Sequence, residues 1–499
     1  MYGRKGEEEM NKKHWLSLTL LGCLLLFVLA IPFTNAVMET QSEVAPTDLA
    51  PFSYSANPIT VNFNTYTGSG FLYNTVTELR AAYDLNTLYT KGYDGSGQTV
   101  VIVDAFGSPT IYSDLLSFIQ WQNTYAGANL PWTTMSQVQR HLTIYYPEGY
   151  VFFNASNADE IGWSTEVTLD VDMVHAIAPG ANIALVISSS DNDVPMNYAV
   201  LWAINHHLGS VISQSWGDPE WDIASSGRSG YSYLMQAHFT YQLAALMGIT
   251  VFASAGDDGA SSLSQYYLPV GYNSPNYPAS DPYVTGVGGT NLFMNCPDGY
   301  SEGTGNWTGQ TSPGLTYNYE IAGNDYEAIT ADGYPAPFDL VTTGGAMSAF
   351  FQLPYWQQGI TMTYANGTSF KPTMRCVSDV SFDSGVYGGL GAVPWSAASP
   401  GSPIYYIVGG TSAGSPFWAA LTAIADQYVH HSLGYINPLL YANMGTFYST
   451  GAFHDITQGD NTYPTGSPLI GYEATKGWDA PTGIGSPDAT SLVLQMKRF

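Results

Sequence analysis

Short apolar runs of strand length alternate with helical stretches from about residue 75 onward, and this alternation restricts the fold more than any other feature of the chain. The runs span residues 99–104, 183–187, 211–215, 250–253 and 405–408. Apolar strands that alternate with helices form mostly parallel sheets that helices cover on both faces. The sequence therefore predicts an α/β fold, in which polar residues that follow the strands gather at the carboxyl edge of the sheet. Residues 290–345, rich in Gly, Thr, Asn and Tyr, are predicted to form irregular surface excursions within this domain.

The charge balance limits the partners and the habitat of the protein. The 499 residues include 40 acidic and 13 basic side chains, which give a formal charge of −27. This sign opposes binding to nucleic acid, which is excluded as a partner. Near pH ~3 most carboxyl groups, with reference pKa values of ~4, are neutral, so the composition fits a protein that works in acid. An ordinary acidic secreted protein and a halophilic protein are the alternatives.

Residues 1–36 are predicted to be a secretory signal or an N-terminal anchor. Lys12 and Lys13 precede an almost unbroken apolar run over residues 15–33, and small residues up to Ala36 suit cleavage. The run also approaches the ~20 residues that a membrane span needs. Under either interpretation the protein is exported, and it is then secreted or held at the cell surface. Residues 37–74 are predicted to be a linker or extended arm, and residues 75–499 the folded domain.

A turn rich in small residues contains a candidate nucleophile. Residues 409–416, with the sequence GGTSAGSP, follow the apolar run 405–408 and precede a helical stretch over residues 417–426. Glycines permit a tight turn there, and free backbone N–H groups near the start of a helix help to bind an oxyanion. Ser412 is therefore a candidate nucleophile, and the alternative is a turn without catalytic function.

Two carboxyl groups on one predicted helix are candidates for the base that such a serine needs. Val167, Val171 and Val174 recur at helical spacing, and Glu166 and Asp170 stand four residues apart, ~40° from one another around the helix. Two carboxyl groups in one site share a proton, so the pair can act as a base at a pH where histidine is already protonated. The alternative is an acidic helix face in contact with solvent.

A third carboxyl group follows another predicted strand. Asp257 lies in the sequence ASAGDDG at residues 253–259, directly after the run 250–253. While protonated, it can donate a hydrogen bond to an oxyanion. Asp258 is the neighbouring candidate, and an Asx-type turn is the alternative. His175, roughly 180° around the helix from Glu166, is predicted to be a packed histidine.

These motifs, together with residues 97–107, 213–217, 277–290, 344–348, 437–441 and 477–485, resemble the sedolisin family of serine-carboxyl peptidases. The resemblance implies a subtilisin-like α/β domain with a seven-stranded parallel sheet over residues 75–499. It also implies an acid-active enzyme that hydrolyses peptide bonds of proteins or peptides through an acyl-enzyme. By motif, Ser412 becomes the nucleophile, Glu166 the general base, Asp170 the residue that orients Glu166 and shares its proton, and Asp257 the oxyanion donor.

The resemblance further implies one structural Ca²⁺ ion near the C-terminus. Residues 453–459 and 474–479 are similar to the two ligand segments of the family. The implied ligands are the carboxylates of Asp455 and Asp479 and the main-chain carbonyls of Ile456, Thr475 and Gly477. A set of oxygen ligands is what a hard cation requires.

Some features depart from the family or leave alternatives open. Only residues 37–74 separate the predicted signal from the catalytic domain, whereas family members commonly carry a propeptide the size of a domain, and Ser378 stands where the family usually has proline. Cys296 and Cys376 would form at most one disulfide. A catalytically silent exported binding protein and a neutral subtilisin-like protease with a histidine base are the rival functions. The choice between endopeptidase and tripeptidyl-peptidase also stays open.

Overall fold

The computed structural model describes residues 60–62, 73–261, 273–295, 316–331, 341–463 and 469–498, which belong to one folded unit over Pro51–Phe499. The predicted signal or anchor at residues 1–36 lies outside the described residues, as does Cys296, the predicted partner of the buried Cys376. Within the described ranges, no helix is both long enough and apolar enough to cross a membrane.

The central sheet has eight strands in the order β10-β9-β7-β5-β2-β4-β3, and β15 pairs with β9. The strands are β2 (Thr99–Ala105), β3 (Leu142–Tyr145), β4 (Asn182–Ser188), β5 (Val211–Gln214), β7 (Thr250–Ser254), β9 (Thr285–Asn295), β10 (Thr316–Ala322) and β15 (Val380–Asp383). All of them except β10 run parallel to their neighbours. The predicted fold class, an α/β fold with a mostly parallel sheet, is confirmed.

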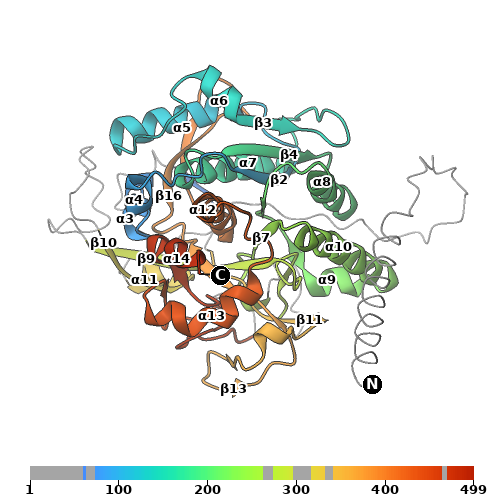
Figure 1. The fold of residues 1–499 in the computed structure, drawn as a ribbon. Helices are drawn as coiled ribbons and strands as arrows, with labels where there is room; N and C mark the ends of the chain where they lie inside the picture. The colour runs from blue at the N-terminus through green and yellow to red at the C-terminus, as the bar shows by residue number, and fades with distance from the viewer. Residues whose placement is uncertain are drawn as a thin grey trace, which may run out of the picture. The chain divides into compact units, whose positions relative to one another are not determined.

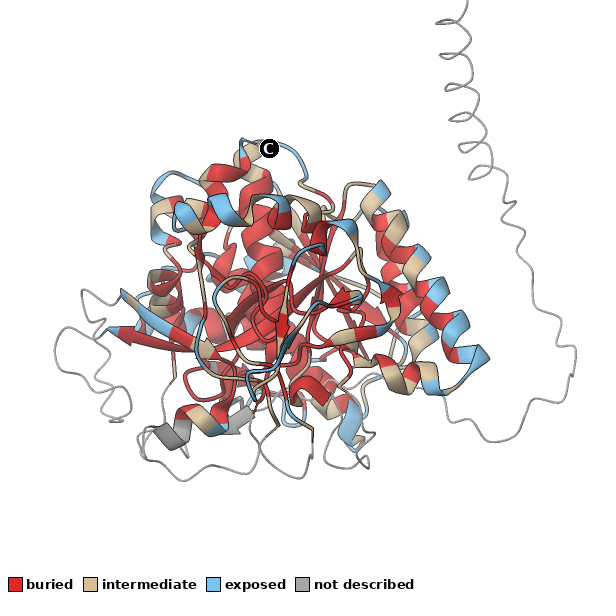
Figure 2. Ribbon diagram, turned by 90° about the horizontal axis from the view of Figure 1, so that it is seen from below, coloured by how far each residue is buried: buried red, intermediate tan, exposed pale blue. Residues whose placement is uncertain are grey.

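Alternating side chains along the strands divide the core into two halves. On β2, Val100 and Ile102 join one apolar cluster, whereas Val101 and Val103 join the other. Because successive side chains of a strand point to opposite faces, helices can pack on both sides of the sheet. Figure 1 shows the resulting layers, and Figure 2 shows that buried residues fill the sheet and the inner sides of the helices.

The first face is covered mainly by α5 (Ile111–Tyr125), α7 (Ala158–Ile177), α12 (Gly414–Val429) and α14 (Ala489–Met496). The second face is covered by α8 (Asp193–Asn205) and α10 (Arg228–Leu246). The remaining helices of the described ranges are α3 (Val76–Ala82), α4 (Asn86–Thr90), α6 (Met135–His141), α9 (Glu220–Ser225), α11 (Asp325–Ala331) and α13 (Asn437–Ser449). Thr75 and Glu78 form a capping box at the start of α3. Within the predicted linker, residues 60–62 pair with residues 406–408 of the folded domain.

Two expectations about the sheet were wrong. The run 405–408 forms β17 (Ile404–Val408), which lies in a separate antiparallel sheet with β16 (Leu390–Trp395) and β1 (Thr60–Asn62). Only the last two residues of β17 are buried, so this strand enters the core at its carboxyl end alone. Residues 290–345 are not merely surface excursions, because β10 pairs with β9 at the edge of the central sheet.

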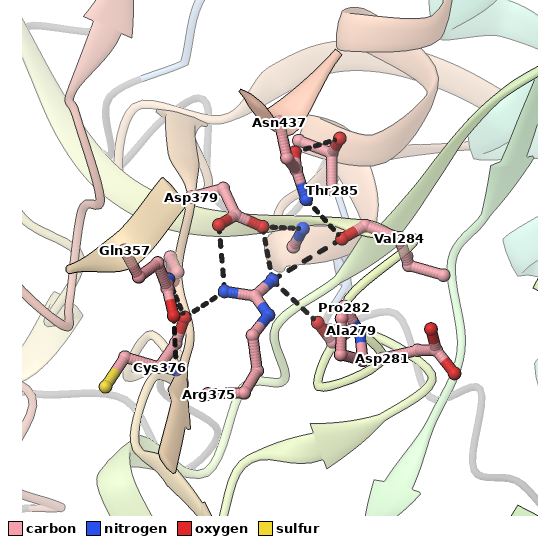
Figure 3. A network of polar contacts seen from close by, with 12 residues as sticks. Ala279, Asp281, Pro282, Val284, Thr285, Gln357, Arg375, Cys376, Asp379 and Asn437 are labelled. Carbon is pink, nitrogen blue, oxygen red and sulfur yellow. Dashed lines mark hydrogen bonds and ion pairs between the residues drawn. The ribbon is translucent and has the colours of Figure 1, made fainter. Parts of the chain in front are cut away.

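Arg375 and Asp379 form a buried ion pair beneath the first residues of β9 (Figure 3). The two guanidinium nitrogens Nη1 and Nη2 lie 2.9 and 2.5 Å from the carboxylate oxygens of Asp379, and neither side chain is exposed to solvent. Arg375 also donates to the main-chain carbonyls of Ala279 and Val284, both at 3.4 Å. The ion pair thus fixes the loop that leads into β9.

Asp379 connects the same ion pair to the neighbouring elements. Its carboxylate accepts hydrogen bonds from the N–H of Gly286 in β9 and from the hydroxyl of Tyr441 in α13, at 2.8 and 2.7 Å. The network therefore joins the loop before β9 to β9 itself and to α13.

Removing the carboxylate charge of Asp379 should destabilise the fold strongly. The substitution Asp379→Asn leaves a buried guanidinium without a counter-charge, so we expect the free energy of unfolding to fall by about 3–5 kcal/mol. Urea denaturation followed by circular dichroism measures this loss. The control Arg228→Met removes an exposed arginine at the start of α10 and should change stability by less than about 0.5 kcal/mol. Similar small losses for both variants would contradict the proposed contribution of the ion pair.

Candidate active site

Ser412 lies in a tight turn between β17 and α12. A single 3₁₀ turn, Thr411–Ala413, precedes the helix, and Ser412 is largely buried. Gly410 has a φ of +93°, and a Cβ at this position would lie 2.6 Å from Asp257 Oδ2. Only glycine fits there, because both the backbone conformation and the close carboxyl group exclude a side chain. The turn is the strand-to-helix connection that the sequence predicts, and it brings Ser412 beside Asp257.

Ser215 joins the serine turn to α7. Its hydroxyl donates to Asp170 Oδ1 at 2.7 Å and lies 3.1 Å from the main-chain carbonyl of Ser412. In return, the hydroxyl of Ser412 lies 3.5 Å from the carbonyl of Ser215. Ser215 directly follows β5, and the segment 213–217 contributes to the family resemblance without an assigned role. The structure thus adds Ser215 as a residue that positions both Asp170 and Ser412.

Glu166 and Asp170 both lie on the fully buried part of α7. Every residue of this helix from Trp163 to Ile177 is buried, so the alternative of an acidic helix face in contact with solvent is wrong. Burial raises the pKa of Glu166 well above its usual value, the charge of Asp104 raises it further, and the hydroxyl of Ser412 lowers it. Neither carboxyl oxygen of Glu166 has a partner in strict hydrogen-bonding geometry, although the effect of Ser412 on its pKa places the two groups close together.

The carboxyl group of Asp170 is held more firmly than that of Glu166. Its Oδ1 accepts the hydrogen bond from Ser215, whereas its Oδ2 has no partner. Burial raises the pKa of Asp170 well above its usual value, and the charges of Asp104 and Glu166 raise it further. The two carboxyl groups therefore interact electrostatically, and together they retain protons at a pH where an isolated carboxyl group has lost them.

Asp104 is a site residue that the sequence reasoning missed. It lies near the carboxyl end of β2, is fully buried, and has no hydrogen-bond partner for either carboxyl oxygen. Burial raises its pKa to about 8. Its position at the end of an apolar strand is the same signal that identified Asp257, and this signal could have identified Asp104 as well.

Asp257 is aimed at the serine turn by hydrogen bonds from Thr411. Its Oδ1 accepts from the N–H and the hydroxyl of Thr411, at 2.7 and 2.8 Å, which leaves Oδ2 beside Gly410 to hold a proton. Burial raises the pKa of Asp257, and the bonds from Thr411 lower it. Asp258 has a pKa raised to about 6 by burial and by Asp257, and within the described residues no hydrogen bond joins it to the serine turn. The geometry therefore favours Asp257 over its neighbour.

His175 lies away from these groups. Its ring stacks on Trp132 with 4.0 Å between ring centroids, and its Nε2 lies 3.3 Å from the carbonyl of Pro131. Burial lowers the pKa of His175 to about 3. In the described part of the chain, no histidine forms a hydrogen bond or ion pair with Ser412 or Glu166.

The two predicted calcium-binding segments lie next to one another. Asp455 Oδ1 accepts from the N–H of Gly477 at 2.9 Å, and Asp479 Oδ2 accepts from the N–H of Thr475 at 3.0 Å. Burial raises the pKa of Asp479 well above its usual value, hydrogen bonds from Thr482 and Thr475 lower it, and the charge of Asp455 raises it further. Over the described ranges, no three His, Cys, Asp or Glu side chains converge to hold a metal. A cation there would also need main-chain carbonyls, such as that of the buried Ile456, or water.

Replacing Asp104 should make the fold less sensitive to pH. Asp104 ionises near pH ~4 in the unfolded chain but at about 8 in the folded protein. The folded state holds the extra proton between these values, so this group favours folding below pH ~4 and loses its contribution as the pH rises toward 8. We expect Asp104→Asn to gain at least about 1 kcal/mol of stability relative to wild type between pH ~4 and ~7.

Urea denaturation at the two pH values measures this gain. The matched control is Asp159→Asn, which changes an exposed carboxyl group in the first turn of the same helix as Glu166 and should show no such trend. An unchanged difference between Asp104→Asn and wild type at both pH values would contradict a protonated Asp104.

Comparisons with known proteins agree with the fold and the motifs. Kumamolisin from Bacillus sp. (strain MN-32) is 30% identical over 410 residues, which are 81% of this chain and 61% of kumamolisin. Sedolisin from Pseudomonas sp. (strain 101) is 27% identical over 344 residues, 68% of this chain and 50% of that protein. The chain thus spans about half to two thirds of the length of these relatives. No protein-family model matches the chain.

A solved structure shares the fold. The structure of Pseudomonas sedolisin, described as a serine-carboxyl proteinase complexed with two molecules of pseudo-iodotyrostatin, matches with a TM-score of 0.62 and 24% sequence identity. The match covers 86% of this chain and 99% of the solved chain. On the combined evidence of the ordered motifs, the relatives and the fold, the chain belongs to the sedolisin family.

Proposed function

We propose that the protein is an exported, acid-active serine-carboxyl peptidase that hydrolyses peptide bonds through an acyl-enzyme on Ser412. One observation carries the proposal: buried carboxyl groups that retain protons converge on Ser412, and no histidine bonds to them in the described ranges. A histidine would be protonated in acid and could not serve as a base there. The names of the relatives, which include a serine-carboxyl proteinase, support the same chemistry.

The proposed reaction begins with proton transfer from Ser412 to Glu166. As Oγ of Ser412 attacks the substrate carbonyl carbon, Glu166 takes the hydroxyl proton, and a tetrahedral intermediate with an oxyanion forms. The protonated Oδ2 of Asp257 donates a hydrogen bond to this oxyanion. Glu166 then gives its proton to the leaving amine, and the C–N bond breaks to leave the acyl-enzyme. Water repeats the sequence and releases the acid.

The remaining residues adjust this proton transfer. Asp170, held by Ser215, interacts with Glu166 and shares the proton load of the pair. The loose contact between Ser412 and Glu166 in the free protein is compatible with the role, since catalytic hydrogen bonds often tighten only when substrate binds. Asp104, whose pKa burial raises to about 8, is neutral in the acid range and adds no negative charge to the pair there.

Two ionisations limit the activity. Glu166 and Asp170 together must lose one proton for the pair to act as a base, which sets the acid limit, and their raised pKa values move this limit upward. Asp257 must keep its proton to donate to the oxyanion, so activity falls as the pH rises through its raised pKa. The expected profile is therefore bell-shaped, with its maximum below neutral pH because carboxyl groups set both limits.

A proteolysis assay across pH ~2 to 8, which spans the reference carboxyl pKa values, tests this function. Wild-type protein should cleave an acid-denatured protein substrate, whereas Ser412→Ala should lower kcat by about 10³-fold or more. Glu166→Gln should cause a comparable loss. The control Ser449→Ala, at an exposed position in α13, should retain full activity.

Two results would reject the proposal. Equal inactivity of wild type and all variants would favour a catalytically silent binding protein on the same fold. A maximum near neutrality would favour a neutral protease with a histidine base.

We also propose that one Ca²⁺ ion stabilises the C-terminal region. Asp455 and Asp479 would supply carboxylate oxygens, and Ile456, Thr475 and Gly477 would supply main-chain carbonyls. Support comes from the contact between the two segments, in which Asp455 accepts from the N–H of Gly477 and Asp479 from the N–H of Thr475, and from the charge of Asp455, which acts on Asp479. When bound, the ion would offset this charge and join the two segments.

Removal of calcium should lower the melting temperature of the wild-type protein. This measurement does not require an activity assay. A site filled at about 100 times its Kd contributes about 2.7 kcal/mol of stability, which a chelator abolishes. Differential scanning fluorimetry at mildly acidic pH, with and without chelator, measures the shift. Asp455→Asn should remove the response to the chelator, whereas the exposed Asp159→Asn should retain it. An unchanged melting temperature of the wild-type protein would reject the site.

We infer that residues 1–36 direct export and that residues 37–74 precede the peptidase domain at residues 75–499. The charge balance and the apolar run at residues 15–33 support export. Proteins or peptides are the proposed substrates, and the negative net charge speaks against nucleic acid as a partner.

A further inference from the structure

The loop between β3 and α7 carries three aromatic side chains in a row. Ring centroids of Tyr146 and Tyr150 lie 5.0 Å apart, and those of Tyr150 and Phe152 lie 5.0 Å apart. Tyr150 is 63% exposed and Phe152 is 85% exposed. We refer to Tyr146, Tyr150 and Phe152 as the aromatic row. Large apolar rings that contact one another in water form an exposed patch for which the proposed catalytic residues offer no explanation.

The aromatic row is held in place at its base. Tyr146 and Val151 pack against the main apolar core, so the residues that face outward alternate with residues that face inward. The carboxylate of Glu148 accepts hydrogen bonds from the N–H and the hydroxyl of Ser189, at 3.1 and 2.5 Å. Ser189 directly follows β4. The row is therefore fixed to the carboxyl end of β4 and is preorganised for contact with a ligand.

The topology places the aromatic row on the same sheet edge as the candidate active site. Tyr145 at the end of β3 pairs with Val186 of β4, and Ile187 of β4 pairs with Asp104 of β2. Neighbouring strands are ~4.8 Å apart, and β5, whose carboxyl end leads to Ser215 beside Ser412, is three strands from β3, so the two are separated by ~14 Å. An extended peptide covers ~3.3 Å per residue and spans this separation with about four residues. The same loop continues into α7, which carries Glu166.

The size of the aromatic row favours a peptide over a folded partner. One aromatic side chain buries at most ~250 Å², so three rings bury less than the ~800 Å² per partner of a typical stable protein interface. A second copy of the chain would need a larger surface than the row supplies. An extended polypeptide needs only a few apolar contacts, and the row continues the sheet edge at which the reacting groups lie.

We propose that the aromatic row binds apolar side chains of an extended polypeptide substrate, about four or more residues from the bond that is cleaved. This inference rests on the proposed peptidase function and deepens it, because it names long, unfolded polypeptides as the substrate class. Contacts so far from the reacting bond lie beyond the reach of very short peptides. The enzyme accordingly prefers apolar segments at this distance from the cleaved bond.

Matched peptides test the proposal. A short peptide of about six residues is compared with peptides that extend the same core by about eight residues at either end, a length that reaches past the row. At each end, one version of the extension carries Leu and Phe, and a second version carries only Gly and Ser. For the wild-type protein, kcat/KM should be higher for the apolar extension at one end, mainly through a lower KM.

The double variant Tyr150→Ser and Phe152→Ser should lower kcat/KM for that apolar peptide by about three- to tenfold. The short and Gly/Ser peptides should be cleaved as by the wild type. The variant Tyr150→Phe retains the ring and should retain the preference. The control Tyr355→Ser removes an aromatic ring that is 72% exposed elsewhere and should change nothing. Loss of rate on all peptides alike, or on none, would overturn the proposal.

A binding measurement separates this inference from the proposed chemistry. Fluorescence anisotropy with labelled peptides and Ser412→Ala protein measures Kd without turnover. Weaker binding of the apolar peptide alone, when the row is also substituted, would support the proposal even if the catalytic assignment failed. Equal Kd values with and without the row would overturn the proposal even if Ser412 proved to be the nucleophile.

Discussion

The rest of the site depends on one constraint: the carboxyl groups of α7 are shielded from water. The helix packs against α5, α12, β2 and β16, so Glu166 and Asp170 have no exposure to solvent. Burial penalises the charged form of each group, and Asp104 adds repulsion from the neighbouring strand. These groups therefore hold protons that an exposed carboxyl group would release. A fold that loses stability as the pH rises follows from this burial.

The parallel sheet brings these groups together from distant parts of the chain. β2, β5 and β7 are adjacent strands, and their carboxyl ends supply Asp104, Ser215 and Asp257 in turn. α12 begins above the same edge and presents Ser412. The contacts within the site come mainly from short polar links, such as the hydroxyl of Thr411 to Asp257. The scaffold supplies position, whereas these links supply orientation.

Much of the fold and part of the site could be predicted from local pattern. The ends of β2, β4, β5 and β7 agree with the predicted apolar runs within one residue. Strands that are buried on both faces consist of apolar residues throughout, so each apolar run marks the strand directly. The sheet that β17 joins could not be predicted in this way, because a short apolar run indicates a strand but not its pairing partners. The effect of Ser378, at a position where the family usually has proline, also depends on a distant segment. Its N–H donates to the carbonyl of Ala480, and proline has no N–H to form this hydrogen bond.

The sequence by itself determined the α/β class, the strand-to-helix turn at Ser412, the helix that carries Glu166 and Asp170, and the family. Each of these depends on residues close together in the chain or on motifs in a fixed order. Only the tertiary structure decided that α7 is buried around Glu166 and Asp170, that Asp104 joins the carboxyl pair, and that Thr411 holds Asp257 and not Asp258. The reason is physical: desolvation and hydrogen-bond geometry depend on neighbours from distant segments, and local periodicity carries no information about them.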